Sequence, residues 1–287
     1  MNKIVVIGAG TMGNGIAHVF AQYAFPVYLV DLNAEQLEKA MATISKNLDR
    51  QVQKGILSIE EKINVLNRIH PVQNIRESVQ GADFIIEAVT ENENIKLRIF
   101  RELDEYASPE AILASNTSSI SITKIAAVTK RPTQVIGMHF MNPVPLMKLV
   151  EVINGYATAG YVTEKIIELT NKLGKTPCVV KDYPGFISNR ILMPMINEAI
   201  ISLQEGVASA EAIDTVMKLG MAHPMGPLQL ADFIGLDVCL AIMKVLQEGF
   251  GNPKYAPATL LVNMVAAGNL GVKSGEGFYN YHTKATP

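Results

Sequence analysis

The sequence predicts an α/β protein with a doubly wound, mostly parallel sheet in residues 1–183 and a C-terminal all-helical domain in residues 184–287. Up to Val180, short apolar segments rich in β-branched residues alternate with segments of helical spacing, which is the pattern of parallel strands and crossover helices. After Tyr183-Pro184-Gly185 the alternation stops, and the later segments all have helical spacing.

The first predicted strand leads into a glycine motif that is typical of dinucleotide binding. Four β-branched residues, Ile4 to Ile7, predict a buried strand, and Gly8-x-Gly10-x-x-Gly13 follows directly. In this motif Gly8 allows a tight turn, Gly10 lets the backbone approach a diphosphate, and Gly13 lets the helix pack on the strand. We expect the first helical turn, Thr11-Met12-Gly13, to bind the diphosphate through its N–H groups, in a sheet of the Rossmann type.

The second predicted strand, residues 26–30, ends in Asp31. A carboxylate at this distance from the glycine motif is expected to bind the adenosine ribose hydroxyls. Neither Arg nor Lys follows Asp31 to pair with a 2′-phosphate, and the carboxylate would repel that group, so NAD is favoured over NADP. The alternative is an ordinary α/β turn that binds nothing.

The remaining elements follow in chain order. Residues 34–66 predict a helical insertion longer than a crossover needs, and its Lys46, Arg50 and Lys54 could contact an anionic substrate tail or form a solvated face. Further strands are expected at 69–72, 84–88, 112–114, 134–137, 146–152 and 176–180, with helices at 92–105, 119–127 and 160–173. The second domain is expected to hold helices at 187–204, 209–218, 227–233, 235–248 and 257–268.

Composition and charge exclude several classes of protein. A net charge of −2 over 287 residues and the lack of a basic block argue against nucleic-acid binding, and no uncharged run is long enough to span a membrane. The first residues lead straight into a strand, which predicts no signal peptide, and Cys178 and Cys239 are expected to be reduced core residues. The prediction is a cytoplasmic protein without a metal site, since no ligand cluster has the required spacing.

Polar residues follow three successive predicted strands, in residues 87–96, 115–119 and 139–142. Because the carboxyl ends of parallel strands meet at one edge of a sheet, these residues predict a binding site there. His139 is expected just past its strand, on a bend stiffened by Pro143 and Pro145. An imidazole, with an ordinary pKa near ~6.5, suits proton exchange with an alcohol, so His139 is a candidate general base. The alternative is a satisfied core histidine.

Four further residues are candidates for the same site. Glu151 is the expected partner of His139, because a carboxylate between two valines is costly to bury unless it is paired. Ser119 is expected to cap the helix that starts there, whereas Ser118 could either cap it or bind a carbonyl or alcohol oxygen. Asn189, in the first turn of the first helix of the second domain, could bind substrate or serve as a surface or capping residue.

Together these motifs resemble those of the short-chain L-3-hydroxyacyl-CoA dehydrogenase family, in particular its bacterial members that act on 3-hydroxybutyryl-CoA. They occur in family order over almost the whole chain: Ile7–Gly13, Glu87–Glu91, Ala114–Ser119, His139–Pro145, Lys148–Val152, Pro184–Arg190 and Lys273–Tyr279.

The resemblance implies interconversion of (S)-3-hydroxybutyryl-CoA and acetoacetyl-CoA with NAD(H). His139 would exchange the 3-hydroxyl proton with Glu151 as its partner, and Ser118 and Asn189 would bind the reacting oxygen. It implies a homodimer formed through the helical domain and contact between Lys54 and the CoA tail. The positions that match NAD contacts are Glu91, Lys96, Asn116, Ser118, Asn142 and Lys273.

Two rival functions remain. One is a β-hydroxyacid dehydrogenase of the kind that uses a catalytic lysine on a free acid or sugar acid, and the other is a non-catalytic NAD-binding protein. The presence of both His139 and Glu151 argues against each.

Overall fold

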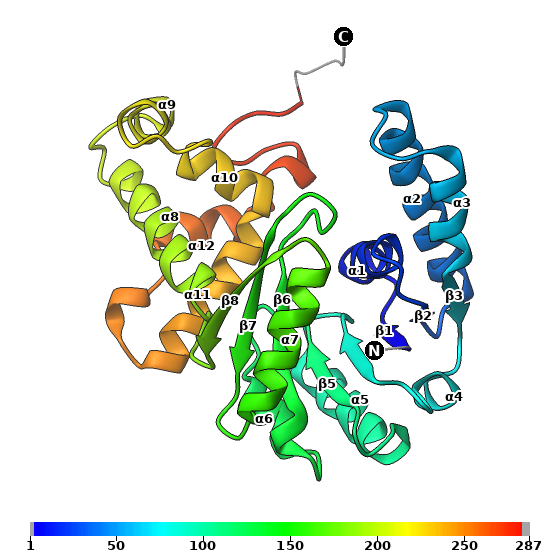
Figure 1. The fold of residues 1–287 in the computed structure, drawn as a ribbon. Coiled ribbons are helices and arrows are strands. Elements are labelled where there is room, and N and C mark those ends of the chain that lie inside the picture. The colour runs from blue at the N-terminus through cyan, green and yellow to red at the C-terminus, as the bar shows by residue number, and fades with distance from the viewer. Residues whose placement is uncertain (1–2, 283–287) are drawn as a thin grey trace. The chain divides into compact units, whose positions relative to one another are not determined.

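The structure, a computed structural model, describes residues 3–282 (Figure 1). Contacts within the chain divide it into two compact units, Met1–Tyr183 and Pro184–Pro287. The first unit is an α/β domain and the second is helical.

The first unit is built on one eight-stranded sheet with the order β3-β2-β1-β4-β5-β6-β7-β8. Neighbouring strands are parallel except β6 and β7, which are antiparallel. The strand order reverses direction between β1 and β4. Ligands of open α/β sheets bind at such a point, outside the carboxyl ends of the strands. The strands are β1 (Ile4–Ile7), β2 (Val27–Val30), β3 (Ile69–Val72), β4 (Phe84–Glu87), β5 (Ile112–Ser115), β6 (Val135–Phe140), β7 (Leu149–Asn154) and β8 (Thr176–Lys181).

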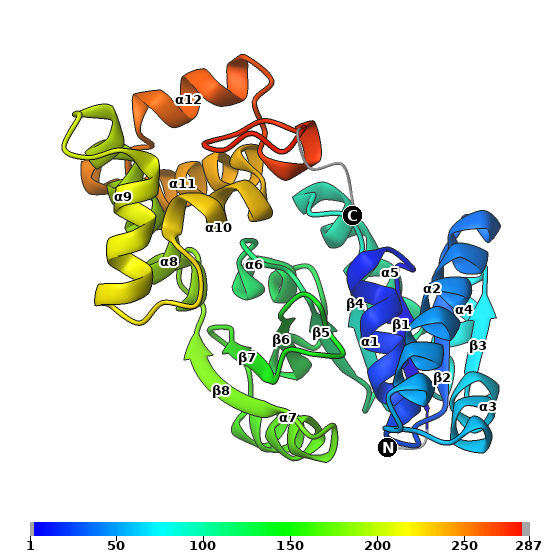
Figure 2. The ribbon, with the colours of Figure 1, turned by 90° about the horizontal axis from the view of Figure 1, so that it is seen from above.

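Helices cover both faces of this sheet, as Figure 2 shows from above. One face carries α1 (Thr11–Gln22), α3 (Ile59–Asn67) and α7 (Gly160–Lys172), with α2 (Ala34–Gln53) packed on α1 and α3. The other face carries α4 (Ile75–Val79), α5 (Glu93–Tyr106) and α6 (Ile122–Ala127). The central strands are therefore buried on both sides, which explains why Ile4–Ile7 is a continuous apolar run rather than an alternating one.

The second unit packs five helices around a core of aliphatic residues and methionines. Asp214 and Asp232 are buried in it, and each accepts hydrogen bonds from backbone N–H groups and a tyrosine hydroxyl, which offsets the cost of burying the two carboxylates. The helices are α8 (Ser188–Gln204), α9 (Ala210–Thr215), α10 (Pro227–Ile234), α11 (Leu236–Phe250) and α12 (Thr259–Ala266). Within residues 3–282, no helix has both the length and the apolar character that a membrane crossing requires.

Several details differ from the sequence-based expectations. Helix α4 was not expected, and α9 ends early in a π-helical turn, Val216–Gly220. The expectation that both cysteines lie in the core is wrong for Cys178, which is exposed because β8 is the edge strand of the sheet; Cys239 is buried.

A further difference concerns the start of α6. The helix begins at Ile122, and its cap is Ser121, whose Oγ accepts a hydrogen bond from the Lys124 N–H at 3.2 Å. The expected cap at Ser119 is therefore wrong. Ser119 instead donates both its backbone N–H and its hydroxyl to Glu91, a long-range partner that local spacing cannot reveal.

Candidate active site

The turn between β1 and α1 has the geometry that its glycines predict. Gly8 has φ +97°, and a Cβ there would lie 2.7 Å from the Ala88 carbonyl oxygen. A Cβ on Gly13 would lie 1.7 Å from the Gly8 carbonyl oxygen, so only glycine allows α1 to approach β1 this closely. A Cβ on Gly10 would meet nothing within 4 Å. The turn thus has open space beside Gly10, at a helix N-terminus without a side-chain cap, where a diphosphate fits.

Asp31 lies at the end of β2 and is tied to the glycine turn. Its Oδ2 accepts a hydrogen bond from the Ala9 N–H at 2.8 Å, and its Oδ1 accepts one from the Asn33 N–H at 3.0 Å. Asp31 also lines a cavity of about 840 Å³, together with Gly8 and Gly10. The residues present therefore fit an adenine dinucleotide whose ribose hydroxyls meet the carboxylate.

His139 and Glu151 form a cross-strand pair. They are register partners on the antiparallel strands β6 and β7, and His139 Nδ1 lies 2.9 Å from Glu151 Oε2. Glu151 is 2% exposed and His139 9% exposed. Since a carboxylate can only accept, Nδ1 donates its proton to Glu151, and the lone pair of the neutral ring then lies on Nε2.

The sequence-based prediction that His139 lies past its strand is wrong, because His139 is the penultimate residue of β6. Strand β6 pairs with β5 only over Val135–Gly137, but its pairing with β7 continues to Phe140. The hairpin with β7 therefore extends β6 beyond the edge set by β5, which spacing alone did not indicate.

The segment between β6 and β7 is held by Lys175, a residue that the sequence analysis did not single out. Lys175 is 8% exposed, and its Nζ donates to the carbonyl oxygens of Val144 at 2.7 Å and Met147 at 2.6 Å. Asn142, in the same segment, lines a second cavity of about 340 Å³ together with Thr11.

Asn116 follows β5 and joins it to β6. Its Oδ1 accepts a hydrogen bond from the Phe140 N–H at 2.8 Å, next to His139, and its own N–H donates to the Glu87 carbonyl oxygen at 2.8 Å. Asn116 therefore fixes the spacing between the ends of three neighbouring strands, β4, β5 and β6.

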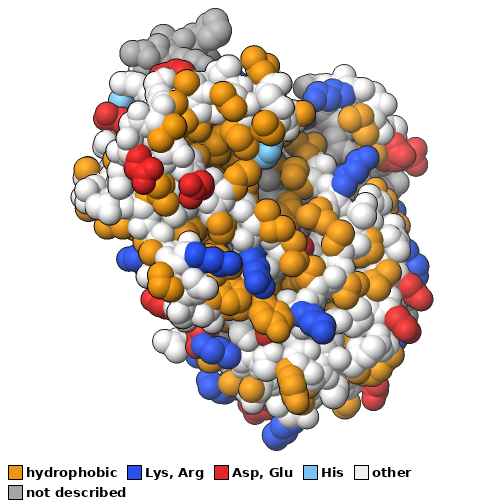
Figure 3. All heavy atoms as spheres, turned by 90° about the vertical axis from the view of Figure 1, so that its left-hand side faces the viewer, with side chains coloured by type: hydrophobic (Ala, Val, Ile, Leu, Met, Phe, Trp, Pro, Cys, Tyr) orange, Lys and Arg blue, Asp and Glu red, His pale blue; other side chains and the backbone are white. Residues whose placement is uncertain are grey.

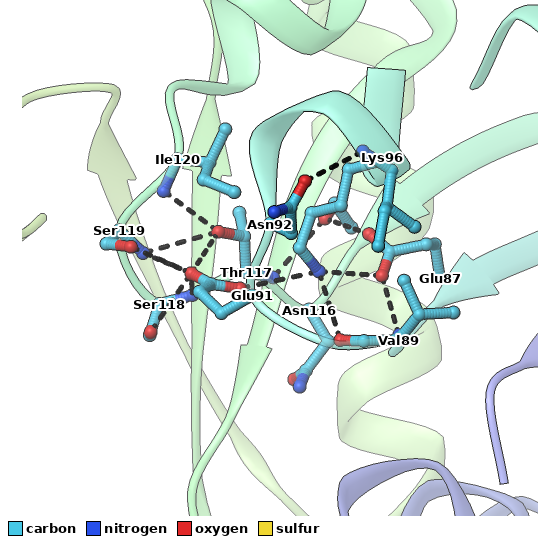
Figure 4. A network of polar contacts seen from close by, with 12 residues as sticks. Glu87, Val89, Glu91, Asn92, Lys96, Asn116, Thr117, Ser118, Ser119 and Ile120 are labelled. Atoms are coloured by element: carbon cyan, nitrogen blue, oxygen red, sulfur yellow. Dashed lines mark hydrogen bonds and ion pairs between the residues drawn. The ribbon is translucent and has the colours of Figure 1, made fainter. Parts of the chain in front are cut away.

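One carboxylate oxygen of Glu91 binds all three residues of the loop Thr117–Ser119. Its Oε1 accepts from the Thr117 hydroxyl at 2.6 Å, from the Ser118 N–H at 2.9 Å and hydroxyl at 3.1 Å, and from the Ser119 N–H at 3.0 Å and hydroxyl at 2.9 Å (Figure 4). Burial acts to raise the pKa of Glu91, but the positive charge of Lys96 and the hydrogen bonds from this loop outweigh burial and hold the pKa below its ordinary value.

Glu87, the last residue of β4, is a charged residue of this region that the sequence analysis left without a role. It is fully buried (0% exposed), and its Oε1 lies 2.6 Å from Lys96 Nζ. Lys96 is 1% exposed, and its Nζ also lies 3.4 Å from Glu91 Oε2 (Figure 4). The position of Glu87 at the end of a strand beside the glycine motif was the signal that could have identified it.

The other predicted residues are distributed over both units. Lys54 is an exposed residue at the C-terminal end of α2, and Met12 packs partly buried in the first turn of α1. In the second unit, Asn189 is 9% exposed in the first turn of α8, and Lys273 forms an ion pair with Asp237. Among residues 3–282, no group of three or more His, Cys, Asp or Glu side chains could hold a metal ion.

Comparisons with known proteins agree with the two units. A family model for the NAD-binding domain of 3-hydroxyacyl-CoA dehydrogenase matches residues 3–183, and one for the C-terminal domain of the same enzyme matches residues 185–281.

Two relatives match this chain over almost their whole length. The chain is 54% identical to a probable 3-hydroxybutyryl-CoA dehydrogenase of Bacillus subtilis, covering 100% of this chain and 99% of the relative. It is 55% identical to a 3-hydroxybutyryl-CoA dehydrogenase of Bradyrhizobium diazoefficiens, covering 98% of this chain and 96% of the relative. A crystal structure of (S)-3-hydroxybutyryl-CoA dehydrogenase from Ralstonia eutropha superimposes with a TM-score of 0.96 at 48% identity, covering 99% of this chain and 100% of the other.

Proposed function

Because the chain belongs to the 3-hydroxyacyl-CoA dehydrogenase family and is an NAD-dependent enzyme, we propose that it interconverts (S)-3-hydroxybutyryl-CoA and acetoacetyl-CoA. The observation that carries the proposal is the pair of His139 and Glu151 at 2.9 Å, at the edge of the sheet where the glycine turn opens. A histidine oriented by a buried carboxylate can act as the general base that takes a proton from an alcohol and as the general acid that returns it.

His139 is the proposed general base. In the direction of oxidation, Nε2 removes the proton of the 3-hydroxyl group, and the imidazole becomes an imidazolium ion. Glu151 then faces a positive charge across 2.9 Å in a buried setting, which stabilises that ion. In the direction of reduction, the imidazolium returns the proton to the oxygen.

The chemistry that bound NAD(H) supplies is the uptake or release of one hydride at the carbon that bears this oxygen. The residues proposed to hold it are the turn Gly8–Gly13, Asp31, Glu91, Lys96, Asn116, Ser118, Asn142 and Lys273. The N–H groups at the start of α1 would bind the diphosphate, and Asp31 would accept from the ribose hydroxyls.

Ser118 and Asn189 are the residues proposed to bind the reacting oxygen. A serine hydroxyl and an asparagine amide are neutral groups that can hydrogen-bond an alcohol in one direction and a carbonyl in the other. Lys54, at the exposed end of α2, is proposed to meet the anionic CoA tail.

A homodimer formed through the second unit is also proposed. Helix α8, α9 and the turn that follows α9 line an apolar groove of about 410 Å³ that includes Met195, Val207 and Val216. Val207 and Val216 are 72% and 58% exposed, and hydrophobic side chains spread over the middle of the face drawn in Figure 3. An apolar surface of this kind is typical of a two-fold interface. The cytoplasmic location stays a prediction.

The test is the loss of NADH absorbance with acetoacetyl-CoA, run beside free acetoacetate and beside acyl-CoA substrates of greater length. The proposal expects turnover of acetoacetyl-CoA and at least roughly 10²-fold less with the free acid, which lacks the CoA part that supplies binding energy. Equal rates with the free acid would favour a hydroxyacid dehydrogenase, and binding of NADH without turnover of any of these substrates would favour a non-catalytic protein.

A further inference from the structure

Among residues 3–183, Glu87 is the most deeply buried charged residue that the proposed reaction does not use. Its carboxylate accepts three hydrogen bonds: Oε1 from Lys96 Nζ at 2.6 Å and from the Val89 N–H at 2.7 Å, and Oε2 from the Ser115 hydroxyl at 2.7 Å. Replacing a buried ion pair by apolar side chains of similar volume is often neutral or stabilising. Fold stability is therefore a weak reason for a charge at this position.

The first chain of contacts from Glu87 leads through two ionic groups to the loop Thr117–Ser119. Lys96 Nζ lies between the carboxylates, 2.6 Å from Glu87 and 3.4 Å from Glu91. It also donates to the Val89 carbonyl oxygen at 3.4 Å. The position of Glu91 thus depends on an ammonium group that Glu87 holds, and Glu91 in turn accepts five hydrogen bonds from Thr117, Ser118 and Ser119 (Figure 4).

The second chain of contacts reaches the same loop from the other side. The Ser115 hydroxyl donates to Glu87 Oε2, and its oxygen accepts the Thr117 N–H at 3.3 Å. The Asn116 N–H donates to the backbone carbonyl oxygen of Glu87 itself. One buried residue is therefore connected to both ends of the segment that carries Asn116 and Ser118.

This arrangement also holds Ser118 by both its backbone N–H and its hydroxyl. Its Oγ lies 3.1 Å from Glu91 Oε1, and because a carboxylate only accepts, the hydroxyl hydrogen points toward Glu91. Because the 3-hydroxyl hydrogen goes to His139, the Ser118 hydroxyl must turn from Glu91 to donate to the reacting oxygen, while the Ser118 N–H stays bound to Glu91 and keeps the residue in place.

We propose that Glu87 is a positioning residue, which acts through Lys96 and Glu91 and through Ser115 to hold the Ser118 hydroxyl where it meets the reacting oxygen. The inference rests on the proposed function. It gives Lys96, also proposed to hold the cofactor, a second role as the link between Glu87 and Glu91, and it gives a reason for an ion pair at 0% and 1% exposure.

The decisive variant is Glu87→Gln, which keeps the shape of the side chain and an acceptor for Ser115 but removes the charge that holds Lys96. We expect kcat for acetoacetyl-CoA reduction to fall roughly 10–100-fold, since small misplacements of groups at the reacting centre cost rates of this size. KM for NADH is expected to change less than kcat. Because a smaller folded fraction alone also lowers the apparent kcat at constant KM, kcat is calculated per NADH-binding site, counted by titration of the folded protein with NADH.

A double-mutant cycle with Ser118→Ala separates positioning from an independent effect. If Glu87 acts through Ser118, the variant with both substitutions is no slower than Ser118→Ala alone. Losses that multiply, or full kcat in Glu87→Gln, overturn the inference. Where Glu87→Gln fails to fold, Ser115→Ala, which removes one hydroxyl, enters the same cycle with an expected loss of several-fold and the same criterion.

The control is Asp104→Asn, which breaks the ion pair of Asp104 and Arg131 at 2.9 Å, also largely buried but outside the candidate site. It is expected to lower the thermal stability and to leave kcat unchanged. Wild-type protein in the same assay distinguishes the two proposals: no turnover by wild-type protein contradicts the proposed function, whereas turnover that Glu87→Gln retains in full contradicts the inference alone.

Discussion

Gly13 packs so closely on Gly8 that a Cβ at residue 13 would lie 1.7 Å from the Gly8 carbonyl oxygen. Gly10, between them, has no other described segment of the chain within 4 Å of an added Cβ. The three glycines of one motif therefore have separable roles, two in the turn itself and one toward the ligand.

This separation predicts that one alanine substitution affects the stability of the fold and the other affects cofactor binding. Gly13→Ala must push α1 away from β1, so we expect it to lower the free energy of unfolding by about 1–3 kcal/mol or more. Gly10→Ala is expected to leave thermal stability nearly unchanged and to raise KM for NAD at least roughly 10-fold, because its methyl group enters the space for the diphosphate. Thermal unfolding measures the change in stability, and steady-state kinetics with varied NAD measure the change in KM. An unchanged KM for NAD in Gly10→Ala would place the diphosphate elsewhere.

His139→Ala is expected to lower kcat roughly 10²–10⁴-fold with little change in NAD affinity, because it removes the base but none of the cofactor contacts. Glu151→Gln keeps a side chain of the same shape and removes the charge opposite the imidazolium ion, so kcat should fall by a smaller factor. Since the two residues act as a unit, the double variant is expected to be no slower than His139→Ala alone. His70→Ala, at an exposed position of the edge strand β3, is the matched control and should keep full turnover. Full kcat in His139→Ala removes the assignment of the base.

Asp31→Ala is expected to raise KM for NAD roughly 10–100-fold, since hydrogen bonds to a charged group contribute about 1.5–3 kcal/mol. Because the carboxylate also repels a 2′-phosphate, the variant should lose part of its preference for NAD over NADP. The measurement is kcat/KM with both cofactors, with Asp49→Ala on the surface of α2 as the control. Unchanged ratios would show that Asp31 only supports the turn.

His18 makes the stability of the first unit sensitive to acid. It is fully buried in α1, its Nδ1 has no hydrogen-bond partner among residues 3–282, and burial lowers its pKa from 6.5 to about 4. Below pH 6.5 the unfolded chain binds a proton that the folded chain does not bind until about pH 4. The unfolding free energy should therefore fall by about 2 kcal/mol between pH 7.5 and pH 5 from this group.

Urea unfolding at the two pH values checks this expectation, with His18→Leu as the comparison. The leucine variant should lose that part of the pH dependence and keep the rest. An identical fall in both proteins would show that His18 does not cause it.

Val216→Glu tests the proposed dimer, because it introduces a charge beside the apolar groove at the end of α9. Burial of an unpaired charge in an interface costs several kcal/mol, so we expect a monomer in sedimentation experiments at concentrations where the wild-type protein is a dimer. Ile59→Glu makes the same change at an exposed position of the first unit and should not affect assembly. A Val216→Glu variant that remains dimeric would place the interface on another surface.

Much of the architecture followed from local patterns. The glycine turn, the division near Tyr183 and the buried pair of His139 and Glu151 could all be predicted, because each has a cause that lies in a few neighbouring residues. A carboxylate between valines requires a partner, and a glycine triplet after a buried strand requires close packing.

The wrong predictions concern features that depend on contacts between segments far apart in the sequence. Ser119 was expected to cap a helix, but Glu91 binds it from a different segment of the chain. Strand β6 was expected to end at Gly137, but its pairing with β7 carries it to Phe140. Glu87 was placed in a polar cluster but given no role of its own, because its partners Lys96 and Ser115 come together with it only in three dimensions.

The reversed direction of β7 has a consequence for how this enzyme can be altered. The ladder of backbone hydrogen bonds, rather than the connecting segment, sets Glu151 opposite His139. Residues could thus be inserted at the hairpin tip without separating His139 from Glu151, as long as the strands pair again in the same register. A shift of the register by one residue would instead place a valine opposite His139 and direct the Glu151 side chain to the other face of the sheet. Hairpin alignment, more than loop length, is therefore what a designer would have to preserve.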